Sequence, residues 1–133
     1  MSHIKVLLVD DEDSFTASME KVLSRRSFEV KVAANGLAAL PLIAKNRFDV
    51  VVLDIKMPGM DGIQALAEIK RLAPDVTVIL LTGHYSLCED DDAWKTQAYA
   101  CLFKPCPIRD LVDMIVAAAS NSDTRPVEPY NSS

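Results

Sequence analysis

The sequence has no excess of basic residues. Fourteen lysines and arginines stand against nineteen aspartates and glutamates, which gives a formal net charge of −5. Because a nucleic-acid surface needs clustered positive charge to neutralise phosphates, this composition argues against binding of DNA or RNA by the chain. The sequence also lacks an apolar run as long as a membrane span, so we expect no membrane association.

Cysteine is scarce as well. The three cysteines, Cys88, Cys101 and Cys106, are an odd number and lack the spacing of metal ligands. We expect reduced, buried thiols of a cytoplasmic protein, with a redox pair of Cys101 and Cys106 as the alternative. A strand pattern begins almost at the N-terminus, which argues against a signal peptide and agrees with a cytoplasmic location.

Apolar runs of strand length alternate with segments that have a helical stripe of apolar residues. The predicted strands are Ile4–Val9, Glu29–Val32, Val50–Asp54, Val76–Leu81 and Ala98–Phe103. The second run alternates like an edge strand, whereas the third and fourth are apolar nearly throughout and are expected to be central. Asp13 or Ser14 is expected to cap the first helix, and Asn35 with Gly36 to open the second.

This alternation predicts an α/β fold with a doubly wound, five-stranded parallel sheet. The flavodoxin-like strand order 2-1-3-4-5 is expected, with helices on both faces. One domain is expected over residues 1–120. Residues 121–133 have almost no apolar content, so we expect a polar, disordered tail or a linker there.

Polar side chains stand where four of the strands end. Asp10 and Asp11 follow the first strand and Asp54 ends the third, while Thr82 and Lys104 follow the fourth and fifth. The carboxyl ends of parallel strands meet at one edge of the sheet, so these side chains are expected in one cleft. Three carboxylates repel one another unless a cation joins them, and oxygen ligands suit Mg²⁺. A carboxylate can also act as a nucleophile and form an aspartyl phosphate.

These residues together resemble the receiver domain of bacterial two-component response regulators. The resemblance covers about residues 5–119, and its motifs stand in order at the strand ends. They are Asp10-Asp11, Leu53-Asp54-Ile55-Lys56-Met57-Pro58-Gly59-Met60-Asp61-Gly62, Thr82-Gly83 and Lys104-Pro105. The resemblance implies that Thr82 and Lys104 contact a phosphoryl group, and that the peptide bond before Pro105 is cis.

The same resemblance assigns the acidic residues. Asp54 would be the phosphoacceptor. Mg²⁺ would be bound directly by Asp11, Asp54 and the backbone carbonyl of Lys56, and through water by Asp10. A sensor histidine kinase or a phosphotransfer protein would donate the phosphoryl group, and an output domain or a partner protein would receive the conformational signal. Such a domain is a switch with self-catalysed phosphotransfer and dephosphorylation, and not an enzyme that turns over a small substrate.

Two features depart from the family pattern. Receivers usually carry an aromatic residue three positions before the lysine, and here that position is Cys101. Tyr99 lies two residues earlier, on the same strand face by parity, so either Tyr99 substitutes or the switch is weakened. Asp90, Asp91 and Asp92 stand where apolar packing is expected in the fourth helix, so we expect a monomer or a weak dimer.

Two alternative functions stay open. One is a receiver-fold binding module whose switch is weakened, for which Cys101 and the acidic fourth helix are the motivation. The other is a hydrolase that works through an aspartyl phosphate. The segment Asp11-Glu12-Asp13-Ser14 faintly resembles the motif of haloacid-dehalogenase phosphatases, but this reading leaves Asp54 without a role.

Overall fold

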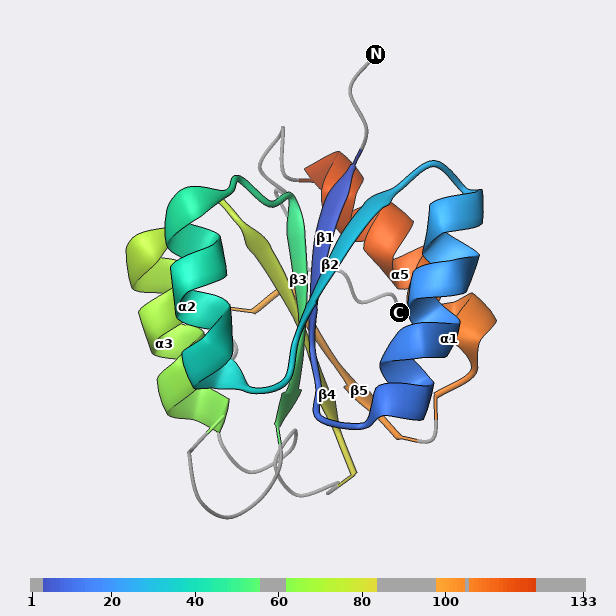
Figure 1. The fold of residues 1–133 in the computed structure, drawn as a ribbon, viewed down its shortest axis with the longest axis horizontal. Helices are drawn as coiled ribbons and strands as arrows, with labels where there is room; N and C mark the ends of the chain where they lie inside the picture. The colour runs from blue at the N-terminus through green and yellow to red at the C-terminus, as the bar shows by residue number, and fades with distance from the viewer. Residues whose placement is uncertain (1–3, 56–61, 84–97, 105, 122–133) are drawn as a thin grey trace.

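The structure is a computed structural model, and it describes residues 4–55, 62–83, 98–104 and 106–121. Five parallel strands form one sheet in the order β2-β1-β3-β4-β5, with helices on both faces (Figure 1). The predicted fold class and strand order are therefore confirmed. The strands are β1 (Lys5–Val9), β2 (Glu29–Ala33), β3 (Val50–Ile55), β4 (Thr77–Thr82) and β5 (Ala100–Phe103), and the helices are α1 (Asp13–Arg25), α2 (Gly36–Lys45), α3 (Gly62–Leu72) and α5 (Ile108–Asn121).

The strands take the positions that their apolar patterns predict. Five of the six residues of β3 are buried, because β3 lies between β1 and β4 and is covered on both faces. The strand β2 is mostly exposed and lies at an edge of the sheet. In the register of the three strands, Leu8 of β1 faces Val32 of β2 on one side and Val52 of β3 on the other.

Each face of the sheet has its own apolar core. The helices α2 and α3 cover one face, and α1 and α5 cover the other (Figure 1). Alternate residues of one strand point to opposite cores: Leu7 belongs to the first and Leu8 to the second. This sandwich of helices leaves the ends of the parallel strands as the place where polar groups can gather.

The helix starts were predicted with mixed success. The Asn35 side chain caps α2 by accepting a hydrogen bond of 2.8 Å from the backbone N–H of Ala38, as expected. The predicted cap of α1 by Asp13 or Ser14 is wrong, because Glu12 occupies the N-cap position and its side chain makes no capping bond. The Glu12 carboxylate instead extends towards Lys104, whose charge attracts it.

Several expectations concern residues outside the described part of the chain. These include the fourth helix and its acidic residues Asp90, Asp91 and Asp92. The division into residues 1–120 and a tail over 121–133 also stays a prediction. None of the described helices has the length and apolar character that would let it span a bilayer.

Candidate functional site

The carboxyl ends of β1 and β3 bring three acidic side chains together. Asp10 and Asp11 follow β1, and Asp54 lies near the end of β3. One carboxylate oxygen from each of the three residues lies within 4.8 Å of the other two. The adjacent strands β1 and β3 end side by side, so Asp54 shares one small cluster with two residues that lie 43 and 44 positions earlier in the sequence.

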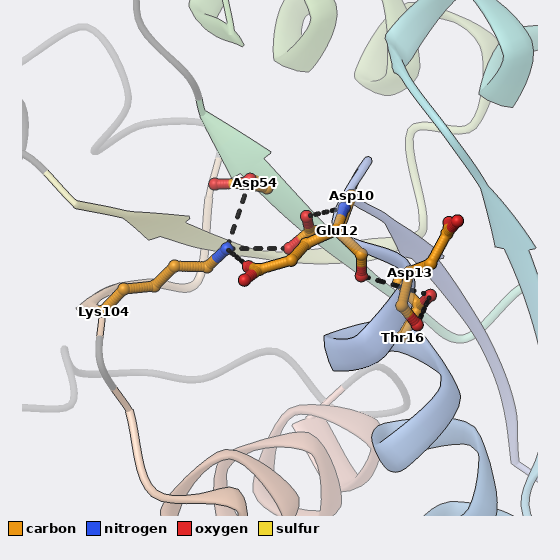
Figure 2. Close-up of polar contacts among 6 residues, drawn as sticks. All are labelled: Asp10, Glu12, Asp13, Thr16, Asp54 and Lys104. Carbon is orange, nitrogen blue, oxygen red and sulfur yellow. Dashed lines mark hydrogen bonds and ion pairs between the residues drawn. The ribbon is translucent and has the colours of Figure 1, made fainter.

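Lys104 directly follows β5, and its side chain points towards Asp10 and Asp54 (Figure 2). Its Nζ atom lies 2.9 Å from an oxygen of Asp10 and 3.3 Å from an oxygen of Asp54. Both carboxylate side chains are almost completely buried. Charge-assisted hydrogen bonds of this kind are stronger than neutral ones, so Lys104 holds the ends of β1 and β3 together.

Burial and charge act in opposite directions on Lys104. Burial lowers the pKa of its ammonium group, because a charged group is harder to keep away from water. The hydrogen bond to Asp10 and the negative charges of Asp54 and Asp10 outweigh burial and leave the pKa of Lys104 above its ordinary value. The lysine is therefore a fixed positive charge at neutral pH.

Thr82 is connected to Lys104 through the backbone. The Lys104 N–H donates a hydrogen bond of 2.8 Å to the Thr82 carbonyl, which extends the pairing of β4 with β5. Thr82 is completely buried, and its neighbour in the sheet on the other side is Ile55, the residue after Asp54. A displacement of Thr82 would therefore be transmitted directly to the start of the segment that carries the lysine.

Both carboxylate oxygens of Asp10 are engaged. One of its carboxylate oxygens accepts a hydrogen bond of 2.9 Å from the backbone N–H of Glu12, and the other contacts Lys104. The Asp10 N–H donates to the Ala33 carbonyl of the neighbouring strand β2 at 3.0 Å. The Asp10 carboxylate thus fixes the backbone of the loop that follows β1.

The donor set fits a hard divalent cation. The cluster offers carboxylate oxygens from two buried side chains, those of Asp10 and Asp54, and from the exposed residue Asp11. Such all-oxygen ligands suit Mg²⁺ or Ca²⁺, and an exposed member leaves room for water on the ion. The predicted fourth ligand, the carbonyl of Lys56, lies outside the described residues, as does the predicted cis bond before Pro105.

Two residues near Lys104 were not identified from the sequence. The carboxylate of Glu12 lies 3.4 Å from its Nζ atom, and the ring centroid of Phe15 lies 5.0 Å from it. In the sequence analysis Glu12 had no role beyond the faint phosphatase motif, and Phe15 had no role in the site. The signal that was available is that both lie at the start of the helix that follows the acidic pair, Glu12 at the N-cap and Phe15 in the first turn.

The cysteines and Tyr99 differ from expectation. Cys101 is disulfide-bonded, whereas Cys106 is a free cysteine. The prediction of reduced thiols is thus wrong for Cys101, since spacing in sequence does not show which sulfurs are close in space. Tyr99 packs against the core beneath α1 and α5, and Cys101 against the opposite core. They do not share a face, because Tyr99 precedes the start of β5 and strand alternation does not extend to it.

Comparison with known sequences supports a single family. The model for the response regulator receiver domain matches residues 6–116. The chain is 33% identical over 115 residues to sporulation initiation phosphotransferase F of Bacillus subtilis, covering 86% of this chain and 93% of that protein. It is 34% identical over 133 residues to the transcriptional regulatory protein PrrA of Mycobacterium tuberculosis, but covers only 57% of that longer protein.

Solved structures agree with the sequence matches. A CheY-like receiver domain from Methanospirillum hungatei has a TM-score of 0.85 at 29% identity, and the match covers 94% of this chain and all of that one. The response regulator TrrA of Thermotoga maritima, solved in complex with Mg²⁺ and beryllium fluoride, has a TM-score of 0.76 at 29% identity, with coverage of 86% and 98%. On the fold, the acidic cluster and these matches, the chain belongs to the receiver domain family of two-component response regulators.

Proposed function

We propose that this chain is a phosphorylation-dependent switch in which Asp54 accepts a phosphoryl group. The observation that carries the proposal is the position of Lys104, whose ammonium group contacts both Asp54 and Asp10 at the edge of the sheet. The Asp54 carboxylate lies beside a fixed positive charge and within 4.8 Å of two further acids. A cation and an ammonium group are what an incoming phosphoryl group needs for its negative charge.

The transfer would be a simple substitution at phosphorus. An oxygen of Asp54 forms a new bond to phosphorus, and the bond between phosphorus and the imidazole nitrogen of a phosphohistidine breaks. The electron pair of the broken bond returns to the imidazole, which takes up a proton. The donor would be a sensor histidine kinase or a phosphotransfer protein, the classes of protein with which receiver domains interact.

Asp10, Asp11 and Asp54 would hold Mg²⁺, with the carbonyl of Lys56 as a further ligand. When bound, the ion offsets the negative charge of the carboxylates and of the phosphoryl oxygens. The Thermotoga relative with Mg²⁺ and beryllium fluoride supports this assignment by analogy. Asp10, which already accepts two hydrogen bonds, would keep its position and act through water.

Thr82 and Lys104 would convert the phosphoryl group into a structural change. The Thr82 hydroxyl and the Lys104 ammonium would each bind a phosphoryl oxygen, and their backbones are already joined between β4 and β5. Binding of both side chains to the phosphoryl group would move the end of β4 and the segment that carries Lys104. An output domain or a partner protein could then recognise the changed surface. We propose that the domain acts as a monomer or a weak dimer in the cytoplasm, although the disulfide bond of Cys101 removes the support that the cysteines gave to that location.

The test is the intact mass of the protein after incubation with Mg²⁺ and acetyl phosphate. We expect one added phosphoryl group on the native chain, no adduct on Asp54→Asn, and none when EDTA removes Mg²⁺. Asp75→Asn is a matched control, because Asp75 is exposed in the turn between α3 and β4 and should be phosphorylated like the native chain. An adduct of equal yield on Asp54→Asn would contradict the assignment.

Two other outcomes would favour the alternatives. Steady release of phosphate without an adduct would indicate either a hydrolase that does not use Asp54 or very fast dephosphorylation of Asp54. The rate of phosphate release in Asp54→Asn separates the two, because it should stay native in the first case and be lost in the second. Neither adduct nor release, although Mg²⁺ binds, would favour a binding module. The observation in favour of that second candidate is Cys101, which is disulfide-bonded at the position where the family usually has an aromatic residue.

A further inference from the structure

The ammonium group of Lys104 is fully occupied in this structure. A lysine has three N–H donors and no acceptor. Three carboxylates lie within reach of the Nζ atom: Asp10 at 2.9 Å, Asp54 at 3.3 Å and Glu12 at 3.4 Å (Figure 2). A phosphoryl oxygen that is to bind Lys104 must therefore replace one of these contacts.

The contact with Glu12 is the one that can be given up most easily. It is the longest of the three, and the Glu12 side chain is 56% exposed, whereas those of Asp10 and Asp54 are 2% and 4% exposed. An exposed carboxylate that leaves the lysine is hydrated at once, so its release costs little. A buried carboxylate that lost its contact with Lys104 would have no water to replace it, so giving up this contact costs far more free energy.

The backbone of Glu12 is fixed, so that only its side chain needs to move. Its N–H donates to Asp10, and its carbonyl accepts from the N–H groups of Phe15 and Thr16 in the first turn of α1. The side chain does not cap the helix and extends to Lys104 instead. The fixed backbone at the start of α1 thus places the Glu12 carboxylate beside the ammonium group of Lys104.

We propose that Glu12 is a positioning residue that occupies Lys104 in the unphosphorylated protein and thereby slows phosphoryl transfer to Asp54. This inference rests on the proposed function. When the phosphoryl group arrives, one of its oxygens replaces the Glu12 carboxylate at the third N–H of Lys104. Asp10 and the ring of Phe15 keep the lysine in place during this exchange. Glu12 therefore stabilises the unphosphorylated state relative to the phosphorylated one.

The test is the variant Glu12→Gln, followed by intact mass over time with Mg²⁺ and acetyl phosphate. Because exposed ion pairs contribute little, we expect phosphorylation to be roughly two- to fivefold faster than in the native chain. Asp13→Asn is the matched control: it removes the same charge from the next residue, which lies beyond Glu12 as seen from Lys104 (Figure 2), and its rate should stay native. A merely structural loss would slow the reaction, so a gain in rate separates the two roles.

A second phosphodonor separates competition for Lys104 from simple repulsion. Phosphoramidate carries less negative charge than acetyl phosphate but delivers the same phosphoryl group. If Glu12 acts by occupying Lys104, Glu12→Gln should increase the rate of phosphorylation by a similar factor with both donors. The nitrogen resonance of the Lys104 ammonium group gives an independent readout, since its protons should exchange with water faster in Glu12→Gln than in Asp13→Asn.

Three results would overturn the inference. The first is a rate for Glu12→Gln that equals or falls below the native rate. The second is an equal gain in Asp13→Asn, which would reflect net charge alone, and the third is a gain confined to acetyl phosphate. In each case a native adduct on Asp54 would leave the proposed function standing. Absence of that adduct in the native chain would overturn the proposed function and this inference together.

Discussion

The Cys106 thiol illustrates how its surroundings act on a single side chain. It is partly buried, and its Sγ atom lies 3.7 Å from the Pro107 carbonyl, to which it donates a weak hydrogen bond. Burial raises the pKa of this thiol, and the negative charge of Asp110 in the first turn of α5 raises it further. Because the thiolate is the reactive form, Cys106 should react slowly with alkylating agents at neutral pH.

The Asp110 contribution can be tested by Asp110→Asn. Removal of the negative charge should lower the pKa of Cys106. The thiolate fraction at a given pH should then increase, and alkylation by iodoacetamide should become about twofold faster. The rate should increase with pH in both proteins and level off at a lower pH in the variant. Asp113→Asn, an exposed change in the same helix, should leave the rate at Cys106 native. Peptide mass mapping locates the label, and an unchanged profile in Asp110→Asn would contradict the electrostatic argument.

Topology explains which site residues could be predicted. Asp10, Asp54 and Lys104 were identified because each stands at or just after the end of a strand, and a parallel sheet gathers such positions at one edge. Glu12 was missed because its role depends on the direction of one long side chain. The bond of Cys101 was missed for a similar reason, since it depends on a distance in space that sequence spacing does not encode.

At the scale of elements, the end of α1 shows a complete helix-terminating motif with an unusual residue. The N–H of Phe28 donates to the Leu23 carbonyl and the N–H of Ser27 to the Ser24 carbonyl, both at 3.1 Å. This is the hydrogen-bond pattern of a Schellman motif, and Leu23 and Phe28 belong to the same apolar core. Ser27 stands at the left-handed position with a φ of 72°, where glycine is usual.

Ser27→Gly should therefore stabilise the protein. The left-handed conformation costs a residue with a side chain about 1 kcal/mol, and glycine avoids this cost. We expect the free energy of unfolding to increase by roughly 0.5–1 kcal/mol, as measured by urea denaturation. Ser24→Gly, the same change three residues earlier and inside the helix, should lower it by about 0.5 kcal/mol or more. Equal signs for the two variants would show that the backbone conformation of Ser27 is not what matters.

The elements themselves were easier to predict than their ends. The stripe that contains Met19 and Leu23 predicts α1, because burial of one face imposes a helical period on the sequence. The cap of the same helix was predicted wrongly, because Glu12, Asp13 and Ser14 are all polar. The sequence does not show that Glu12 takes the N-cap position while its side chain contacts Lys104. The failure at this helix start is thus connected with the candidate site that it borders.

At the scale of the whole molecule, the layered architecture follows from burial on both faces of the central strands. The central strand β3 is buried on both faces and therefore requires helices on both sides, as the parallel, doubly wound sheet supplies with α2 and α3 on one face and α1 and α5 on the other. The same architecture concentrates Asp10, Asp11 and Asp54 at one end of a protein whose net charge is already −5. The site is therefore a place where the fold tolerates repulsion.

Relief of this repulsion gives a prediction for the stability of the whole domain. If Mg²⁺ binds the folded state only, it should raise the free energy of unfolding by about 1.4 kcal/mol at ten times its dissociation constant, and the increase should continue with the logarithm of its concentration. Thermal and urea unfolding with Mg²⁺ or with EDTA measure this effect, with NaCl at matched ionic strength as the control for screening. Asp11→Asn should lose most of the stabilisation, because it removes a proposed direct ligand, whereas Asp75→Asn should keep it. Equal stabilisation by NaCl, or full stabilisation of Asp11→Asn by Mg²⁺, would contradict a metal site in the acidic cluster and attribute the effect to general screening of charge.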